Sequence, residues 1–289
     1  GDIETAFDSI TYQKGASVLA MFETWVGEDT FRNGMREYLA SHRFGSGNSD
    51  DLIVSLTKAS GKGEAFAKAM RSFLDQPGIP LVRADLACKD GKAKIDLKQS
   101  RYLPYGVLGE GEPRWGAPVC TRFGRGDDTS MQCFLLEKSE QRFDVAGGCP
   151  DWYLPNAGAR GYYRFEMASA DLSKLDGAIA HLSAPEQVVH ADALSSGFER
   201  GEIEPGVVLD AMPSLAKSDM PQVATALLPS FEWIREQIAD AHSRDVLDAY
   251  AMSIYRPRLE QLGYRRKADD TSIAIALRAR LAQFLAIVV

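Results

Sequence analysis

The sequence has 289 residues, of which 45% are hydrophobic and 25% are charged, and its formal net charge is −7. This composition is typical of a globular protein with two or three domains, and no run of eighteen apolar residues is present to span a membrane. Because acidic residues outnumber basic ones, the chain is poorly suited to neutralise the phosphates of a nucleic acid. We therefore expect no nucleic-acid partner.

The first part of the chain has apolar residues at helical spacing. A helix is expected to start after Asp8 and Ser9, which resemble a cap, and to stop at Gly27. Tyr12 lies in the first turn of this helix. A tyrosine at this position either packs against its neighbours or presents its phenol for chemistry, and the helical pattern alone leaves both readings open.

Three further helices are expected before the first sharp break in the pattern. The second opens with acidic residues that suit the helix dipole. Ser49 or Asp50 is expected to cap the third, which ends before Gly61. The fourth covers roughly 63–75, and the prolines within 77–80 then mark a junction.

After this junction the hydrophobic pattern changes from a period of 3.6 residues to a period of two. Short alternating runs separated by turn residues predict a β-sandwich. Arg125–Gly126–Asp127 spells an adhesion tripeptide, but its place between two such runs favours a hairpin turn. The strand-like runs are 81–88, 92–99, 117–123, 131–136, 141–145 and 161–167.

All four cysteines, Cys88, Cys120, Cys133 and Cys149, fall in this strand-rich region. An even count without C-x-x-C spacing or a nearby histidine argues against a zinc cluster and favours disulfides in an oxidising compartment. Four free, buried thiols are the alternative. Cys120 and Cys133 flank the expected hairpin turn, so a bridge between neighbouring strands is the preferred pairing.

Helical periodicity returns near residue 170 and continues to the end of the sequence. Ser183 is a cap residue, and a proline follows it in the first turn. Helix after helix with short connections suggests a bundle or a solenoid. The later helical segments centre on 207–212, 223–228, 231–242, 246–255 and 273–287.

The sequence contains no self-contained catalytic or metal-binding motif. His42, His181, His190 and His242 are scattered, and no two are four residues apart as in a histidine-pair metal site. No G-x-S-x-G motif is present, and no cysteine has a histidine context that would identify a nucleophile. We therefore expect no metal ligand within this chain.

Residues 7–19, FDSITYQKGASVL, resemble the segment that follows the zinc site in the M1 family of zinc aminopeptidases. The family pattern there is approximately F-D-x-I-x-Y-x-K-G-A-x-V-L, and its tyrosine matches Tyr12. The resemblance is specific in the first 80 residues and loose after residue 100. It continues through 27–39, 49–52, 75–82, 152–156 and 161–165.

The resemblance implies an α+β multidomain fold with three parts. Residues 1–76 would be the helical end of a thermolysin-like catalytic domain, against which the rest of that domain packs. Residues 77–168 would be a β-sandwich domain. Residues 169–289 would be the first part of a solenoid-like, α-helical C-terminal domain.

The resemblance also implies an aminopeptidase that removes N-terminal residues from peptides. In the family a zinc-bound water attacks the peptide carbonyl, and a tyrosine phenol, here Tyr12, helps to hold the resulting oxyanion. The family's H-E-x-x-H motif, its glutamate ligand and its amine-binding residues are absent and would precede Gly1. We therefore expect zinc only in a longer parent protein, an isolated fragment that is inactive, and no assignable substrate-binding residue here.

Two further expectations remain as alternatives. Proteins of this architecture that lost their metal site serve as non-catalytic scaffolds, although a retained Tyr12 favours the enzyme. The cysteines favour a periplasmic or secreted location, and a cytoplasmic location is the alternative.

Overall fold

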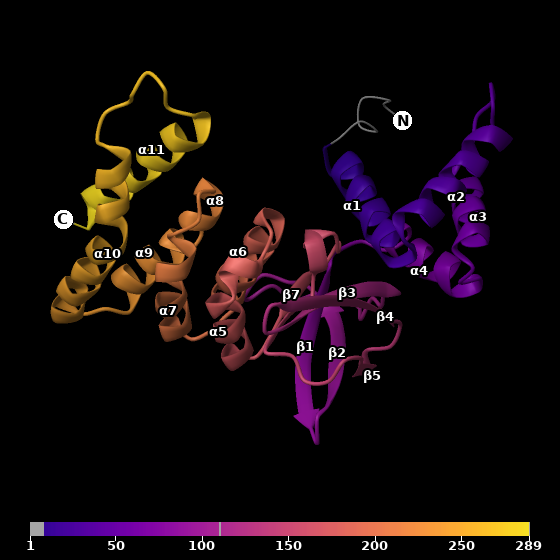
Figure 1. Ribbon diagram of the computed structural model, residues 1–289, viewed down its shortest axis with the longest axis horizontal. Coiled ribbons are helices and arrows are strands. Elements are labelled where there is room, and N and C mark those ends of the chain that lie inside the picture. Colours follow the sequence, from indigo (N-terminus) through magenta and orange to yellow (C-terminus); the bar gives the residue numbers. More distant parts are fainter. Residues whose placement is uncertain (1–8, 110, 289) are drawn as a thin grey trace. The chain divides into compact units, whose positions relative to one another are not determined.

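The computed structural model describes residues 9–109 and 111–288, with helices first, strands next and helices again at the end (Figure 1). The chain divides into two compact units. Unit 1 ends at Met167, and unit 2 begins at Ala168 and also takes in Pro104–Gly106. Among the described residues, no helix combines the length and the hydropathy needed to cross a membrane.

From residue 9 onward, the described part of unit 1 starts with four α-helices. Gly27, with φ of 90°, separates the first two, as the sequence predicted. The prediction for the cap of the third helix was wrong by one or two residues, because the N-cap is Asn48 rather than Ser49 or Asp50. Asn48 and Asp51 each accept a hydrogen bond from the other's backbone N–H, which satisfies two helix-start donors. The helices are α1 (Ser9–Val26), α2 (Glu28–Ser41), α3 (Ser49–Ser60) and α4 (Glu64–Leu74).

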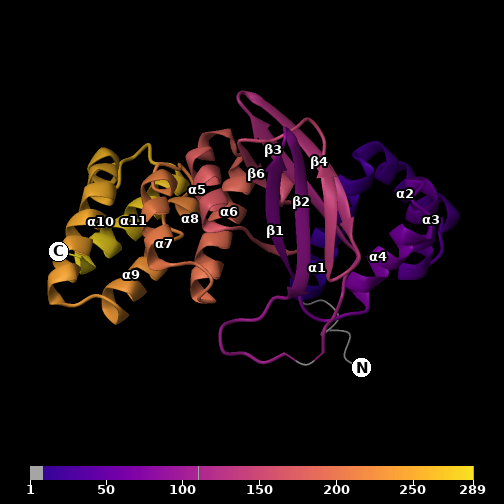
Figure 2. The same cartoon turned by 90° about the horizontal axis from the view of Figure 1, so that it is seen from below.

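The strands of unit 1 form two sheets, which Figure 2 shows with β1 beside β2 and β3 beside β4. The four-stranded sheet has the order β5-β2-β1-β7, and the three-stranded sheet has the order β4-β3-β6. All pairs are antiparallel except β1 with β7. The strands are β1 (Pro80–Lys89), β2 (Lys92–Arg101), β3 (Ala117–Arg125), β4 (Asp128–Leu136), β5 (Glu140–Val145), β6 (Trp152–Leu154) and β7 (Arg164–Glu166).

The two sheets share a buried interior. Tyr153 of one sheet is 1% exposed, and its hydroxyl donates a hydrogen bond to the carbonyl of Ala84 in the other sheet at 2.9 Å. Phe134 and Phe143, also on different sheets, have ring centroids 5.0 Å apart. The hydrogen bond to the backbone carbonyl satisfies the buried Tyr153 hydroxyl. It therefore offsets the free-energy cost of removing this hydroxyl from water.

The tripeptide at 125–127 forms the hairpin turn between β3 and β4, as the sequence predicted, because Arg125 pairs with Asp128 across it. The guanidinium of Arg125 donates hydrogen bonds to the carbonyls of Ala146 and Gly148 at 2.7 and 2.8 Å. Arg125 therefore uses these donors in hydrogen bonds within unit 1. This supports a structural role for the tripeptide as a turn.

The preferred cysteine pairing is confirmed. Cys120 and Cys133 lie opposite each other on β3 and β4 and form a disulfide, with their Cα atoms 3.9 Å apart. Cys88 and Cys149 form a second disulfide, with Cα atoms 5.7 Å apart. The alternative of four free thiols does not hold, because each cysteine in the described part of the chain is bridged.

In its described part from Ala168 onward, unit 2 consists of helices and the loops between them, with no strand. The predicted Ser183 cap is confirmed and forms a capping box with Glu186. The single segment expected over 231–242 is instead divided, because Asp240 caps a new helix and accepts a hydrogen bond from the N–H of Ser243. The α-helices are α5 (Ser169–Gly177), α6 (Ala184–Glu199), α7 (Pro205–Leu215), α8 (Pro221–Ala224), α9 (Leu228–Gln237), α10 (Ala241–Leu262) and α11 (Ser272–Ile287).

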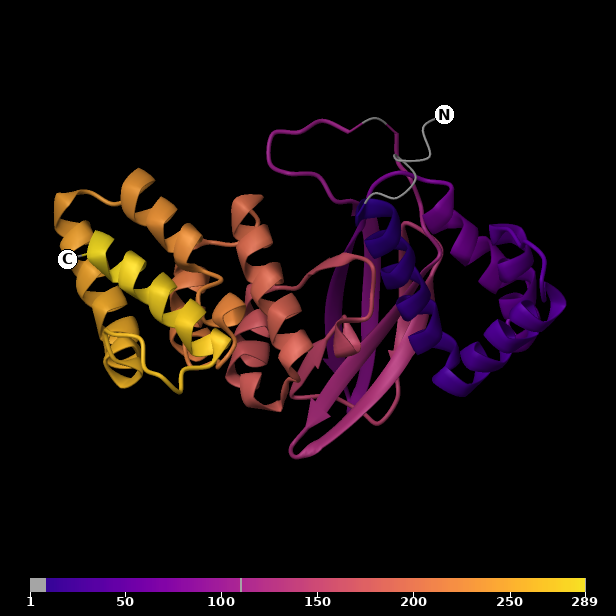
Figure 3. The ribbon, with the colours of Figure 1, turned by 90° about the horizontal axis from the view of Figure 1, so that it is seen from above.

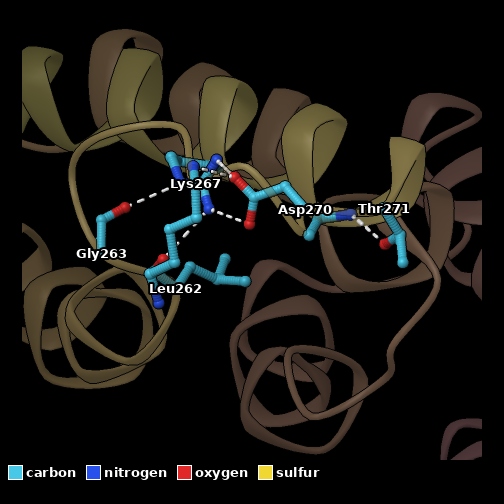
Figure 4. Close-up of polar contacts among 7 residues, drawn as sticks. Leu262, Gly263, Lys267, Asp270 and Thr271 are labelled. Atoms are coloured by element: carbon cyan, nitrogen blue, oxygen red, sulfur yellow. Dashed lines mark hydrogen bonds and ion pairs between the residues drawn. The ribbon is translucent and has the colours of Figure 1, made fainter.

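An ion pair fixes the connection between α10 and α11 (Figure 4). Arg278 donates to both carboxylate oxygens of Asp270 at 2.7 and 2.8 Å, and also to the carbonyls of Leu262 and Gly263 at 3.0 and 2.8 Å. The N–H of Lys267 donates to Asp270 at 2.6 Å. These hydrogen bonds, above all those from Arg278, lower the pKa of Asp270 to about 2.

Candidate functional site

Tyr12, the only catalytic residue that the sequence predicted, lies near the start of α1 with its side chain 60% exposed. Asp8, half of the expected cap, and Phe7 of the family pattern lie outside the described residues. The exposed ring argues against the interpretation that Tyr12 is merely a buried packing residue. Tyr12 is thus a surface residue of unit 1.

Further along α1, the helix packs into the core of unit 1. Phe22 is 0% exposed, and its ring lies edge-on to Phe66 and Phe73, with centroids 5.1 and 6.1 Å away. The ammonium group of Lys14 donates a hydrogen bond to the carbonyl of Gln76 at 3.3 Å. The helix that carries Tyr12 is therefore held by packing two to three turns away and by a polar contact within its first turns.

A groove of about 450 Å³ lies beside α1 in unit 1. Figure 3 shows α1, in indigo, running along the strands of this unit. Its helical wall consists of small side chains, Ala16, Ser17 and Ala20. Ala16 is one turn from Tyr12 on the same side of the helix, and Ala20 follows one turn later. The groove therefore begins next to the candidate catalytic side chain.

The opposite wall of the groove is the segment 159–164, which enters β7. The parallel pairing of β7 with β1 fixes this segment and places Arg164 opposite Leu81. The guanidinium of Arg164 lies over the ring of Tyr102, with its central carbon 4.3 Å from the centroid. A cation on an aromatic face is held in place and keeps its charge.

Two contacts connect this wall to α1. The guanidinium of Arg160 forms an ion pair with the Glu23 carboxylate. The N–H of Tyr162 donates to the sulfur of Met21 at 3.4 Å. Partial burial raises the pKa of the Tyr162 phenol. The groove thus has two walls that are held to each other.

Zinc is the metal of the resembled family, and the described residues do not fit it. No group of three or more His, Cys, Asp or Glu side chains that could hold a metal ion occurs in the described part of the chain. His190 is fully buried and lies 3.4 Å from an Asp176 oxygen, which also accepts a hydrogen bond from Ser214 at 2.5 Å. This cluster connects α5, α6 and α7 of unit 2 and has too few ligands for a metal.

Sequence reasoning found Tyr12 but assigned no residue to the groove. The motif at 161–165 was recognised, yet Arg164 received no role because strand pairing, and not sequence spacing, brings it to the groove. The small residues at positions 16 and 20 were a detectable signal, since they recur at helical spacing from Tyr12 on one side of α1.

Comparison with known families defines the class of protein. Residues 1–76 match the model of the peptidase family M1 domain, and residues 152–288 match the model of the ERAP1-like C-terminal domain. Relatives named as M1 aminopeptidases support the same assignment. The chain therefore belongs to the M1 peptidase family.

Individual relatives align with most of this chain. Aminopeptidase 2 of Candida albicans is 29% identical over 97% of the chain, and the puromycin-sensitive aminopeptidase of Caenorhabditis elegans is 26% identical over 98%. The probable M1 family aminopeptidase 1 of Encephalitozoon cuniculi is 34% identical over 68%. The chain spans only 30%, 30% and 21% of the lengths of these three proteins, respectively.

Proposed function

We propose that this chain is a segment of an aminopeptidase that removes N-terminal residues from peptides, and that Tyr12 acts at the reacting bond. The observation that carries the proposal is a tyrosine that is 60% exposed, near the start of a packed helix, at the tyrosine position of a family motif. The names of the relatives and the match of residues 1–76 to the M1 domain support it.

The role proposed for Tyr12 is to donate a hydrogen bond. When a nucleophile attacks a peptide carbonyl, negative charge develops on the carbonyl oxygen, and a donor fixed beforehand stabilises that charge without reorganising. The packing of Phe22 and the Lys14 contact hold α1 in place before the reaction. Losing one such donor costs about 10²–10³ in turnover.

The proposal places the zinc ligands and the nucleophile's activating residues in a longer protein rather than in this chain. Residues 1–76 would be the helical end of a thermolysin-like catalytic domain, with the remainder of that domain packed against them. Residues 77–168 would be its β-sandwich and 169–289 part of its helical C-terminal domain. The two disulfides support an oxidising location, periplasmic or secreted, over a cytoplasmic one.

The proposal is tested by comparing the chain with the longer protein that contains it. Both are supplied with zinc and incubated with a short peptide, and release of its first residue is followed by mass spectrometry. We expect stoichiometric zinc and stepwise N-terminal removal for the longer protein, and neither for the chain alone. A longer protein that binds peptide without cleaving it would support the non-catalytic scaffold instead, and turnover by the chain alone would contradict the proposed location of the ligands.

A further inference from the structure

The start of α1 lies outside the core of unit 1, and a hydrogen bond ties it to the residues that follow α4. None of the side chains from Tyr12 to Ser17 is buried, and the first buried side chain after them is Val18, which is 1% exposed. Val18 lies about 9 Å along the helix axis from Tyr12. Because helix ends fray, the bond from the Lys14 ammonium to the carbonyl of Gln76 at 3.3 Å supports α1 where its own packing is weakest.

Gln76 has a defined position, because its side chain bonds to two different segments. The amide nitrogen of this side chain donates to the carbonyl of Ser72 in α4 at 3.0 Å and to the carbonyl of Arg114 at 2.8 Å. Both N–H groups of the amide are thereby used. Arg114 lies 38 residues further along the chain, just before β3. The carbonyl that accepts from Lys14 therefore belongs to a residue held between α4 and the entry to β3.

The segment that leads into β3 is itself fixed. Trp115 is 1% exposed, and its backbone N–H and carbonyl both bond to the side-chain amide of Gln99 in β2, each at 2.9 Å. The N–H of Gly116 donates to the Ser72 hydroxyl at 2.9 Å. A Cβ at Gly116 would lie only 2.6 Å from the Cα of Ala69, so a glycine is needed for this close approach to α4. This segment is a rigid support for the end of α4.

The direction of the Lys14 contact leaves the side of α1 that carries Tyr12 open. Residues two positions apart on an α-helix are rotated by about 200° and do not face each other. Lys14 therefore holds α1 from the side nearly opposite to Tyr12. Its bond to Gln76 fixes the helix without filling the space around the phenol.

We propose that Gln76 is a positioning residue for Tyr12 and that it acts through the ammonium group of Lys14. The inference rests on the proposed function, because it takes the Tyr12 phenol to donate to the developing oxyanion. Such a donor is effective only if it is aimed before the charge develops. A displacement of about 1 Å at a reacting group can cost about 10² in rate, so the support that Gln76 gives to the start of α1 contributes to turnover.

The test measures kcat and KM of the longer, zinc-loaded protein with a short peptide for Gln76→Met, Lys14→Met and Lys14→Arg, each alone and combined with Tyr12→Phe. Methionine keeps an unbranched side chain and removes the donor, whereas arginine keeps a charged donor. Gln141→Met is the matched control, because the Gln141 amide oxygen also accepts two backbone N–H bonds, in the turn before β5. Thermal unfolding of each variant reports whether it is folded.

We expect Gln76→Met and Lys14→Met to lower kcat about tenfold with little change in KM, because they displace the donor without removing it. Lys14→Arg should retain most of kcat, and Gln141→Met should leave it unchanged. In the Tyr12→Phe background, Gln76→Met and Lys14→Met should change kcat by less than about twofold, because the hydroxyl that they position is gone.

Hydrogen exchange followed by mass spectrometry provides a readout that does not depend on turnover. Deuterium uptake by the backbone amides of residues 13–17 should increase in Gln76→Met and Lys14→Met, because the start of α1 opens more often. Uptake by residues 19–26 should stay unchanged, since the packing of Phe22 is untouched. Unchanged uptake over 13–17 in both variants would contradict the proposed support.

Three kinetic outcomes would also overturn the inference. Full kcat in folded Gln76→Met would show that Tyr12 does not depend on it, and if that variant does not fold, full kcat in Lys14→Met would show the same. A loss of equal size in the Tyr12→Phe background would show that the variants act other than through the phenol. An equal loss in Gln141→Met would indicate a general weakening of unit 1. In these cases Tyr12→Phe alone still lowers kcat and the proposed function stands, whereas full kcat in Tyr12→Phe would remove both.

Discussion

Asp270 is the residue whose ionisation is tied most closely to the fold of unit 2. Its side chain and that of Arg278 are each 7% exposed, and hydrogen bonds from Arg278 and the Lys267 N–H hold its pKa at about 2, against an ordinary value of 3.8. Because the pKa is lower in the folded chain, the ionised carboxylate stabilises the folded state above about pH 4. That contribution is lost as the pH falls from about 4 toward 2.

We therefore expect Asp270→Asn to lower the urea midpoint of the helical signal of unit 2 at pH 6, and this difference from the unmodified chain to shrink between pH 4 and pH 2. Circular dichroism at a series of pH values measures both midpoints. Asp269→Asn is the matched control, since Asp269 is an exposed neighbour, and it should show no such pH-dependent difference. A difference for Asp270→Asn that stays constant down to pH 2 would show that the ion pair does not stabilise unit 2.

The sequence could identify Tyr12 but not the residues around it. The helical period and the family motif located Tyr12 at the start of a helix, and both are local signals. The position of Arg164 depends on a parallel strand pair between residues about 80 positions apart. Asp270 depends on Arg278, eight positions later in the next helix, which is brought back by the loop between α10 and α11. Neither contact has a local signal, because tertiary packing creates it.

At the scale of single elements, the strands of unit 1 are joined by two disulfides of unequal loop length. The sequence separations are 13 residues for Cys120–Cys133 and 61 residues for Cys88–Cys149. A disulfide that closes a longer loop restricts the unfolded chain more strongly. The chain-entropy model gives about 3 kcal/mol for the shorter loop and about 4 kcal/mol for the longer one.

Replacing both cysteines of a pair with alanine should accordingly destabilise unit 1, and the Cys88–Cys149 double variant should be affected more. Guanidinium unfolding followed by tryptophan fluorescence measures the two free energies. Alkylation under denaturing conditions without reductant is the control, and it should label no cysteine in the unmodified chain. Labelling of all four cysteines would show that neither disulfide forms. The argument for an oxidising location would then be lost.

The positions of helices and strands were predictable from the sequence where several neighbouring residues give the same signal, a hydrophobic period followed by turn residues. The four helices of unit 1 and six of its strands follow from hydrophobic period and turn residues. The cap at Asn48 and the break at Asp240 were missed, because several adjacent polar residues can cap a helix and only the hydrogen-bond geometry selects one. The pairing of β7 with β1 was not predictable from spacing.

For the molecule as a whole, the two units have different expected roles. Unit 1 carries Tyr12, the groove and both disulfides, whereas unit 2 has a separate helical core. The chemistry proposed for this chain therefore depends on unit 1 together with residues that lie outside the chain. The family assignment spans both units, since one family model matches residues 1–76 and another matches 152–288.

The most direct measurement is steady-state peptide hydrolysis by the longer, zinc-loaded protein with Tyr12→Phe, which removes the hydroxyl and keeps the ring. Tyr105→Phe is the matched control, since Tyr105 is 80% exposed and lies outside the groove. We predict that Tyr12→Phe lowers kcat by about 10²–10³ while KM and thermal stability stay nearly unchanged, because only the transition state needs this donor. Full kcat in Tyr12→Phe would contradict the account.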